Sequence, residues 1–248
     1  MDIGKAFAYI SEDEEWTKKL LVGALIGAVP FANFAIFGYQ AEIARNVAAG
    51  EERPLPDWSD FGRFFLDGLR LVAAFFVYLL PMILLIIVST IGFVFLAESS
   101  SQSYSSYGSS APPSPEFMII FGLMFACLIP YNFLIYALWP LFSIQIAREG
   151  TVGSCFQFSE MWRLVRAQPI NYLLILVLLF GMYMVSMIII LPAYLLVFIP
   201  CIGYLIYMAI YGGVLMLILM VIGHLQGQFI SEDNPPTEKT PDFDLESF

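Results

Sequence analysis

Long apolar segments dominate the sequence, at residues 20–44, 69–97, 117–146 and 169–226. A helix needs about 20 apolar residues to cross the ~30 Å hydrocarbon core of a bilayer. The last segment is long enough for two such helices, and Pro200 with Gly203 predicts a turn between them. Only 13% of the residues are charged, whereas soluble domains carry about 25%. The sequence therefore predicts an all-α, polytopic helical membrane protein with about five transmembrane helices and two or three interfacial amphipathic helices.

Changes in composition along the chain predict its organisation. We expect a polar interfacial segment (1–19), a first membrane repeat (20–97) with an amphipathic helix (57–68), a Ser-rich disordered loop (98–116), a second membrane repeat (117–198) with an amphipathic helix (156–167), a last transmembrane helix (199–228) and an acidic disordered tail (229–248). At the end of the first of these segments, Trp16 with Lys18 and Lys19 predicts an anchor at the membrane interface.

The first apolar segment is interrupted near its middle by Pro30 and Asn33. Proline removes a helix hydrogen bond and kinks the helix, so the pattern favours a kinked spanning helix. A re-entrant hairpin that turns at Pro30 is the alternative. Gly23 and Gly27 form a small-xxx-small pair, which predicts that another helix approaches closely there.

The first amphipathic pattern follows the turn Pro54-Leu55-Pro56. Asp57 is typical of a helix N-cap. Apolar residues recur at the 3–4 spacing of one helix face, and charged residues occupy the opposite face. The pattern predicts a helix that lies flat at the membrane surface. The apolar set is Trp58, Phe61, Phe65, Leu69 and Val72, and the charged set is Asp60, Arg63, Asp67 and Arg70.

The second amphipathic pattern lies about one hundred positions later. Ser154 to Gln157 has the spacing of a capping box. The residues Phe158, Met161, Trp162 and Val165 then form one side of a short predicted helix, and Glu160, Arg163 and Arg166 form the other.

Three landmarks recur in the same order in the two halves of the chain. They are Pro30 and Pro130, each followed by an asparagine (Asn33, Asn132), the sequences EIAR (42–45) and QIAR (145–148), and the Ser-acid-x-x-Arg patterns at 59–63 and 159–163. This order predicts a tandem duplication whose halves run in the same direction across the membrane.

The repeat also predicts sidedness. The arginines fall on one face if the predicted spans alternate, and an excess of arginine marks the cytoplasmic side of a cell membrane. The arginine-rich loops and the C-terminus would then be cytoplasmic and the Ser-rich loop outside. This assignment leaves the N-terminus outside, with Lys18 and Lys19 on the wrong side. A re-entrant first segment would place the N-terminus inside.

Residues 44–72, ARNVAAGEERPLPDWSDFGRFFLDGLRLV, resemble the family known as domain of unknown function 4013. The resemblance covers most of residues 1–226 and is strongest at 55–58 (LPDW) and at 67–69 (Asp-Gly-Leu). It implies a multi-pass membrane fold. It transfers no functional site, because no activity of the family is implied.

The sequence offers few groups for catalysis. It contains no P-loop, HExxH or GxSxG motif, and its single histidine and three scattered cysteines argue against a metal site. We expect no catalytic, cofactor-binding or metal-binding residue, and no nucleic-acid partner, since no basic patch is present. Glu42 is interpreted as a helix-end ion pair with Arg45, or alternatively as a ligand of a substrate or ion. His224 is interpreted as an interfacial residue rather than a proton relay.

Two function classes remain. The leading hypothesis is a non-enzymatic integral membrane scaffold or accessory subunit that binds lipid, a copy of itself or another membrane protein. The alternative is a small oligomeric transporter or channel with a site near Asn33, Asn132 and Glu42; a lipid-modifying enzyme ranks third. The candidate interaction residues are Arg45, Trp58, Phe61, Arg63, Phe65, Arg70, Arg148, Trp162, Arg163 and Arg166, together with the acidic tail.

Overall fold

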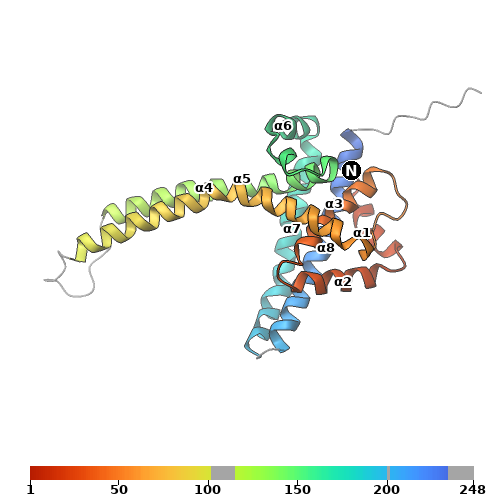
Figure 1. Ribbon diagram of the computed structural model, residues 1–248, viewed down its shortest axis with the longest axis horizontal. Coiled ribbons are helices and arrows are strands. Elements are labelled where there is room, and N and C mark those ends of the chain that lie inside the picture. The colour runs from red at the N-terminus through yellow and green to blue at the C-terminus, as the bar shows by residue number, and fades with distance from the viewer. Residues whose placement is uncertain (102–114, 200–201, 234–248) are drawn as a thin grey trace, which may run out of the picture. The chain divides into compact units, whose positions relative to one another are not determined.

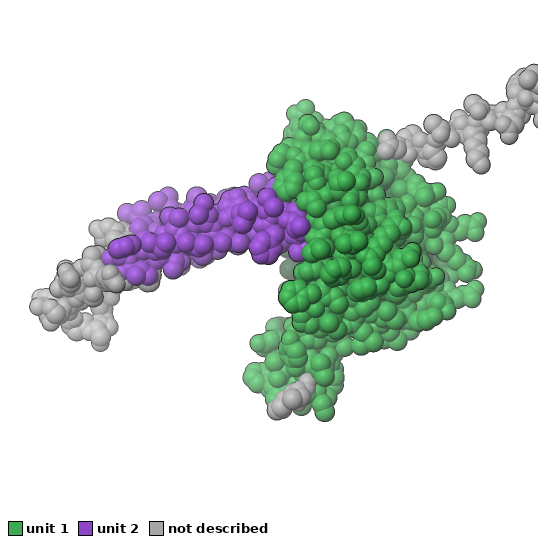
Figure 2. Space-filling view, in the orientation of Figure 1, with its two compact units in different colours: residues 1–71, 140–248 green, residues 72–139 purple. Residues whose placement is uncertain are grey.

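The computed structural model describes residues 1–101, 115–199 and 202–233, and this part of the chain is helical without a strand. It divides into two compact units (Figure 2). Unit 1 comprises Met1–Leu71 and Pro140–Phe248, and unit 2 comprises Val72–Trp139. The all-α class predicted from the sequence is confirmed.

The helices of the described residues are labelled along the chain in Figure 1. They are α1 (Ile3–Glu12), α2 (Trp16–Ala28), α3 (Phe34–Ala48), η1 (Trp58–Asp60), α4 (Phe61–Ser101), α5 (Pro115–Glu149), η3 (Val152–Phe156), α6 (Phe158–Ala167), α7 (Pro169–Ala193), η4 (Tyr194–Phe198) and α8 (Ile202–Asp233).

Among the described residues, four helical stretches are long and apolar enough to cross a membrane. They are Trp58–Gly92, Met118–Glu149, Pro169–Phe198 and Ile202–Asp233. The chain is therefore a polytopic helical membrane protein, as predicted, and the described residues provide four candidate spans where the sequence predicted about five.

The first apolar segment supplies no spanning helix, so the prediction of one kinked helix over 20–44 is wrong. Its residues form α2 and α3, which are 13 and 15 residues long. Val29 before Pro30 is extended, as residues before proline usually are. Phe31 then adopts a left-handed conformation with φ 67°. The chain thus turns at Pro30, which is where the hairpin alternative placed the turn.

The first amphipathic pattern does not form a separate flat helix. After the single turn of η1, α4 continues from Phe61 into the membrane segment without a break. The predicted amphipathic helix (57–68) and the apolar segment (69–97) meet at Gly68, with no proline beside it. A single glycine is too weak a breaker to end a helix. Asp57 makes no capping hydrogen bond. Asp67, placed on the water-facing side by the pattern, is only 3% exposed.

The second pattern does form a separate helix, α6, which ends at Ala167 before Pro169 opens α7. Its buried side consists of Met161 and Leu164, whereas Phe158 and Trp162 are 60% and 57% exposed. The predicted capping box is absent, because the Ser154 hydroxyl donates to the carbonyl of Thr151 instead of receiving the Gln157 amide.

Helix α8 lies at the centre of unit 1, where α2, α3 and α7 pack against it. Glycines allow the close approach. A Cβ on Gly27 would lie 3.3 Å from Gly212 Cα, and a Cβ on Gly227 would overlap Val47. The contact of Gly27 is the one that the small-xxx-small spacing predicts.

The pairing of α3 with α4 is closer still. A Cβ on Gly38 would overlap the backbone of Phe64, and a Cβ on Gly68 would overlap the backbone of Phe34. The two helices therefore cross with their backbones in contact, at the two glycines.

Unit 2 is a hairpin of α4 and α5. The Tyr131 hydroxyl donates to the Tyr78 carbonyl at 2.5 Å, and Phe75 meets Trp139 edge to face. Most of its described side chains are apolar and exposed, which suits a surface surrounded by lipid. The described ends of the predicted Ser-rich loop, 98–101 and 115–116, are helical, and the rest of it lies outside the described residues. Residues 229–233 of the predicted tail belong to α8, and the remainder of the tail also lies outside the described residues.

Candidate functional site

Five charged residues of α3 and α4, defined here as the Arg45 cluster, form an ion-pair network in unit 1. The Arg45 guanidinium lies 2.7 Å from Glu42 and 2.6 Å from Asp67. Arg63 pairs with Glu42 at 2.9 Å and Arg70 with Asp67 at 2.7 Å. Each of the two carboxylates thus has two arginine partners.

Arg45 also joins this network to the end of α5. Its Nε donates to the carbonyl of Ala147 at 2.9 Å, and its Nη2 to that of Ile146 at 2.8 Å. Burial alone would lower the pKa of Arg45, but the hydrogen bonds that its guanidinium donates to Glu42 and Asp67 outweigh burial and raise the pKa above its ordinary value. The guanidinium satisfies carbonyls that the last turn of α5 leaves open.

A second ion-pair network ties α5 and α6 to the end of α8. Arg163 binds Glu160 through two hydrogen bonds of 2.8 Å and Asp233 at 3.0 Å. Arg148 lies 3.2 Å from Glu160 and 3.6 Å from Asp233. The Arg163 hydrogen bonds lower the pKa of Glu160. The arginines of both predicted repeat halves therefore meet acids within unit 1. The duplication itself stays a prediction.

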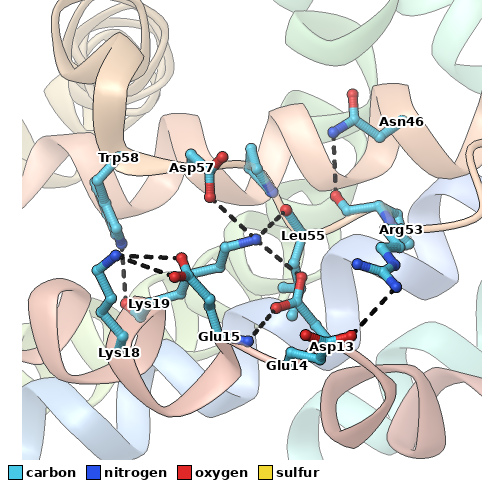
Figure 3. A network of polar contacts seen from close by, with 12 residues as sticks. Asp13, Glu14, Glu15, Lys18, Lys19, Asn46, Arg53, Leu55, Asp57 and Trp58 are labelled. Atoms are coloured by element: carbon cyan, nitrogen blue, oxygen red, sulfur yellow. Dashed lines mark hydrogen bonds and ion pairs between the residues drawn. The ribbon is translucent and has the colours of Figure 1, made fainter.

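A third network surrounds Lys19 at the start of α2 (Figure 3). Its ammonium lies 2.8 Å from Asp13 and 3.2 Å from Asp57, and it donates to the carbonyl of Leu55 at 2.8 Å. The Trp58 indole donates to the Lys19 carbonyl at 2.9 Å. Burial lowers the pKa of Lys19, but the bonds to Asp13 and Asp57 outweigh it and raise the pKa overall. The contacts of Lys19 thus hold α2 against the segment that precedes α4.

The predicted interaction residues fall into two groups. Arg45, Arg63, Arg70, Arg148 and Arg163 are held by acids of the chain itself, as the distances above show. The aromatic candidates of η1 and α4 pack on α3: Trp58 of η1 stacks on Tyr39 at 4.5 Å, and Phe65 of α4 stacks between Phe34 and Phe61.

The second group lies on α6. Arg166 stands over the Trp162 ring at 4.9 Å. Among the arginines, all of which are described, it alone lacks an acidic partner within the described parts of the chain. The exposed Phe158 lies one turn before Trp162. We define Phe158, Trp162 and Arg166 together as the α6 surface.

The residues predicted for transport do not form one site. Asn33 precedes α3, and its Oδ1 is buried without a partner among the described residues. Glu42 belongs to the Arg45 cluster, more than two turns further along the same helix and so about 13 Å away. Asn132 lies in unit 2, where its side chain is exposed.

Sequence reasoning missed a buried amide cluster where α3, α5 and α8 meet. Gln40 and Ser143 both donate to Gln226 Oε1 at 3.0 Å, and Gln226 Nε2 donates to the carbonyl of Pro140 at 3.3 Å. All three side chains are fully buried. Their signal was present in the sequence, since polar residues inside apolar segments usually bond to one another between membrane helices.

Unit 1 contains cavities, among them two that open beside its N-terminal helices. One of about 440 Å³ lies beside α1 and α8 and contains His224, and one of about 290 Å³ lies beside Lys19 and Trp58. Neither is lined by Asn33, Asn132 or Glu42. In the parts of the chain that are described, no three histidines, cysteines or acids are grouped so that they could hold a metal ion. The buried charges of the three networks are paired within the chain.

The family described as Protein of unknown function (DUF4013) matches residues 21–198. We found no match to the chain among curated proteins or among solved structures.

Proposed function

The chain belongs to the DUF4013 family, and from its geometry we propose that it is a non-enzymatic integral membrane scaffold or accessory subunit. It contacts membrane lipid or a protein partner through the α6 surface. In this proposal it performs no reaction of its own.

The observation that carries this proposal is the α6 surface itself. Two large aromatic rings stand more than half exposed on α6 while Met161 and Leu164 face the protein. The helix ends immediately before Pro169, where the spanning helix α7 begins. Tryptophan and arginine next to a membrane entry are suited to the headgroup region, where one end of the side chain is apolar and the other is wet.

We further propose that this end of unit 1 faces the cytoplasm. Arg45, Arg53, Arg163 and Arg166 lie outside the four candidate spans, whereas Arg63 and Arg70 lie in the first part of Trp58–Gly92 and Arg148 lies at the end of Met118–Glu149. Met1 lies 3.0 Å from Glu232, and Asp2 is bonded to Gln228, so the first residues and the end of α8 share this side. An arginine excess on one face supports a cytoplasmic assignment.

The test is purification of the full chain from its own membranes in a mild detergent, followed by native mass spectrometry. We expect wild-type protein to retain a stoichiometric partner or bound lipid, and the variant Trp162→Ala/Arg166→Ala to lose it. Arg53→Ala, which removes an exposed arginine away from α6, should retain it. A double variant that keeps everything the wild type keeps would refute the role of α6.

The second candidate function is a small oligomeric transporter or channel. The unpartnered, buried Oδ1 of Asn33 favours it, because a buried polar atom without a bond is costly unless water or a ligand reaches it. Flux of ions or small solutes into reconstituted vesicles, reduced by Asn33→Ala, would support this function. Vesicles with the protein that are no more permeable than empty ones would reject it.

A further inference from the structure

Helix α2 ends against the middle of the apolar part of α8. The residues from Ile202 to Ile222 of α8 include no charged residue and no histidine, glutamine or asparagine. At 1.5 Å per residue this stretch rises about 30 Å, which matches the thickness of the hydrocarbon core of a bilayer. Gly212 is its middle residue, and a Cβ on Gly27 would lie 3.3 Å from Gly212 Cα. With α8 across a bilayer, the end of α2 therefore lies near the bilayer centre.

The start of α2 lies among charged residues, where Lys19 pairs with Asp13 at 2.8 Å. Residues 20–32, which follow, contain no polar side chain. From Lys19 to Gly27 the helix rises about 12 Å, and one leaflet contributes about 15 Å of hydrocarbon. Helix α2 is therefore long enough to reach the bilayer centre from one interface and too short to cross to the other.

Helix α3 returns toward the polar end of α8. A Cβ on Gly223 would lie 2.9 Å from the carbonyl oxygen of Gln40, and a Cβ on Gly227 would lie 2.8 Å from that of Ala44. Later residues of α3 thus meet later residues of α8, beyond its apolar part. Together, α2 and α3 form a hairpin whose two ends lie at the same end of α8 and whose turn lies deeper.

The turn of this hairpin provides partners for its own backbone. Irregular backbone inside a bilayer is tolerated only where its polar groups are satisfied. Pro30 has no amide hydrogen. The amide of Val29 donates to the carbonyl of Ile26 at 3.1 Å, that of Ala32 to Pro30 at 2.9 Å, and that of Asn33 to Val29 at 3.1 Å. The Oδ1 of Asn33 is buried as well. These groups of the turn are therefore compatible with a position inside the hydrocarbon.

One face of α2 and its turn is large, apolar and exposed. It lies opposite the glycines that meet α8, and we define it as the α2 face. Its members are Leu21, Leu25, Val29 and Phe31, which are 59%, 64%, 53% and 73% exposed. Helices that meet inside a bilayer do so mainly through small or polar side chains, because lipid tails are as apolar as leucine. The α2 face has neither kind of side chain, so it is suited to lipid tails and not to another helix.

We propose that α2 and α3 form a re-entrant hairpin that enters a single leaflet, the one on the side where α8 ends, and that the acyl chains of this leaflet cover the α2 face. The hairpin then displaces lipid from that leaflet alone. This lipid-contact surface is separate from the α6 surface, and it is recognised by hydrocarbon depth and not by charge.

The experiment places one nitroxide label at a time on the full chain, with its three cysteines replaced by alanine, in phosphatidylcholine vesicles. Electron paramagnetic resonance compares collisions of the label with oxygen, which is concentrated in hydrocarbon, and with a nickel chelate, which stays in water. Leu25→Cys and Phe31→Cys should report the same depth as Tyr211→Cys, an exposed site beside Gly212. Leu21→Cys should lie up to about 6 Å shallower, since it precedes Leu25 by four residues.

The control is Glu14→Cys, whose side chain is 83% exposed and precedes α2; its label should report water. Labels at Leu25 and Phe31 that report water as Glu14→Cys does would overturn the proposal. Equal, shallow depths at Leu21, Leu25 and Phe31 would mean that α2 lies flat on the membrane, which also overturns it. A label at Leu25 that neither reagent reaches, or that broadens through a second label nearby, would show that protein covers the face and refute the assignment to lipid. All of these sites are exposed and none lies on α6, so the test is independent of that of the proposed function.

Discussion

Replacement of Arg45 by alanine tests whether one guanidinium holds three helices together. The change removes ion pairs to Glu42 and Asp67 and two hydrogen bonds to carbonyls at the end of α5. Breaking a buried ion pair costs about 3–5 kcal/mol. Arg63 and Arg70 still neutralise the two acids in the variant, which lowers that part of the cost. The two carbonyls lose charged donors worth about 1.5–3 kcal/mol each.

We expect Arg45→Ala to lower the free energy of unfolding by about 3–5 kcal/mol. The retained arginine partners of the two acids reduce the loss, and the lost bonds to the two carbonyls increase it. A domain of this size changes its melting temperature by about 2–4 °C per kcal/mol, so we expect a fall of about 10 °C. The assay is thermal unfolding in detergent followed by tryptophan fluorescence, with all variants heated at one rate. The control is Arg53→Ala, whose 3.6 Å contact with Glu14 is exposed on both sides. A fall no larger than that of the control would refute the reasoning.

Three further predictions use the same preparation. Gly68→Ala should abolish the folded state, since its Cβ would overlap the backbone of α3, and the yield of monodisperse protein measures this. Gly62→Ala, with nothing within 4 Å, should leave the melting temperature unchanged or raise it slightly, as thermal unfolding will show. Burial raises the pKa of the Cys155 thiol to about 11, so at pH 8 a maleimide should label it only after unfolding in SDS, as mass spectrometry of the peptides will show. Burial acts to raise the pKa of Asp13, but the bond from Lys19 outweighs it and lowers the pKa below 3.8. The stabilising contribution of Asp13 is present above its unfolded pKa of about 3.9 and is lost as the pH falls through its folded pKa. The difference in melting temperature between wild type and Asp13→Asn should therefore be full at pH 6 and shrink below about pH 4.

The apolar segments predicted α4, α5, α7 and α8, because length and composition alone decide whether a helix can cross a bilayer. Breakers were equally informative where they were strong. Helix α6 ends before Pro169. Of the predicted turn, Gly203 belongs to α8, which begins at Ile202, and Pro200 lies outside the described residues. The chain also turns at Pro30, although the sequence favoured a kink there. A proline inside an apolar segment permits both outcomes, and the contacts of α2 and α3 with α8 decide between them.

The charged contacts could not be predicted from spacing alone. On α4, a helical wheel assigns Asp67 to the water side together with Arg63 and Arg70. Its burial results from Arg45, a residue of another helix that reaches it at 2.6 Å. Similarly, Asp57 had the local pattern of an N-cap but pairs with Lys19. In each case a partner distant in sequence outweighs the local preference, which is worth only about 1 kcal/mol.

The number of spans bears on the proposed sidedness of the chain. Five spans would put the first residues and the end of α8 on opposite faces. If the four candidate spans among the described residues all cross the membrane, their even number would return the end of α8 to the face from which α4 departs. The 3.0 Å contact of Met1 with Glu232 agrees with this arrangement, since it joins the first residue to the last turn of α8. In the proposed topology Lys18 and Lys19 lie on the same side as the arginines, and Lys19 is paired with Asp13 and Asp57. The conflict that a first spanning helix created at the start of the chain would then be absent.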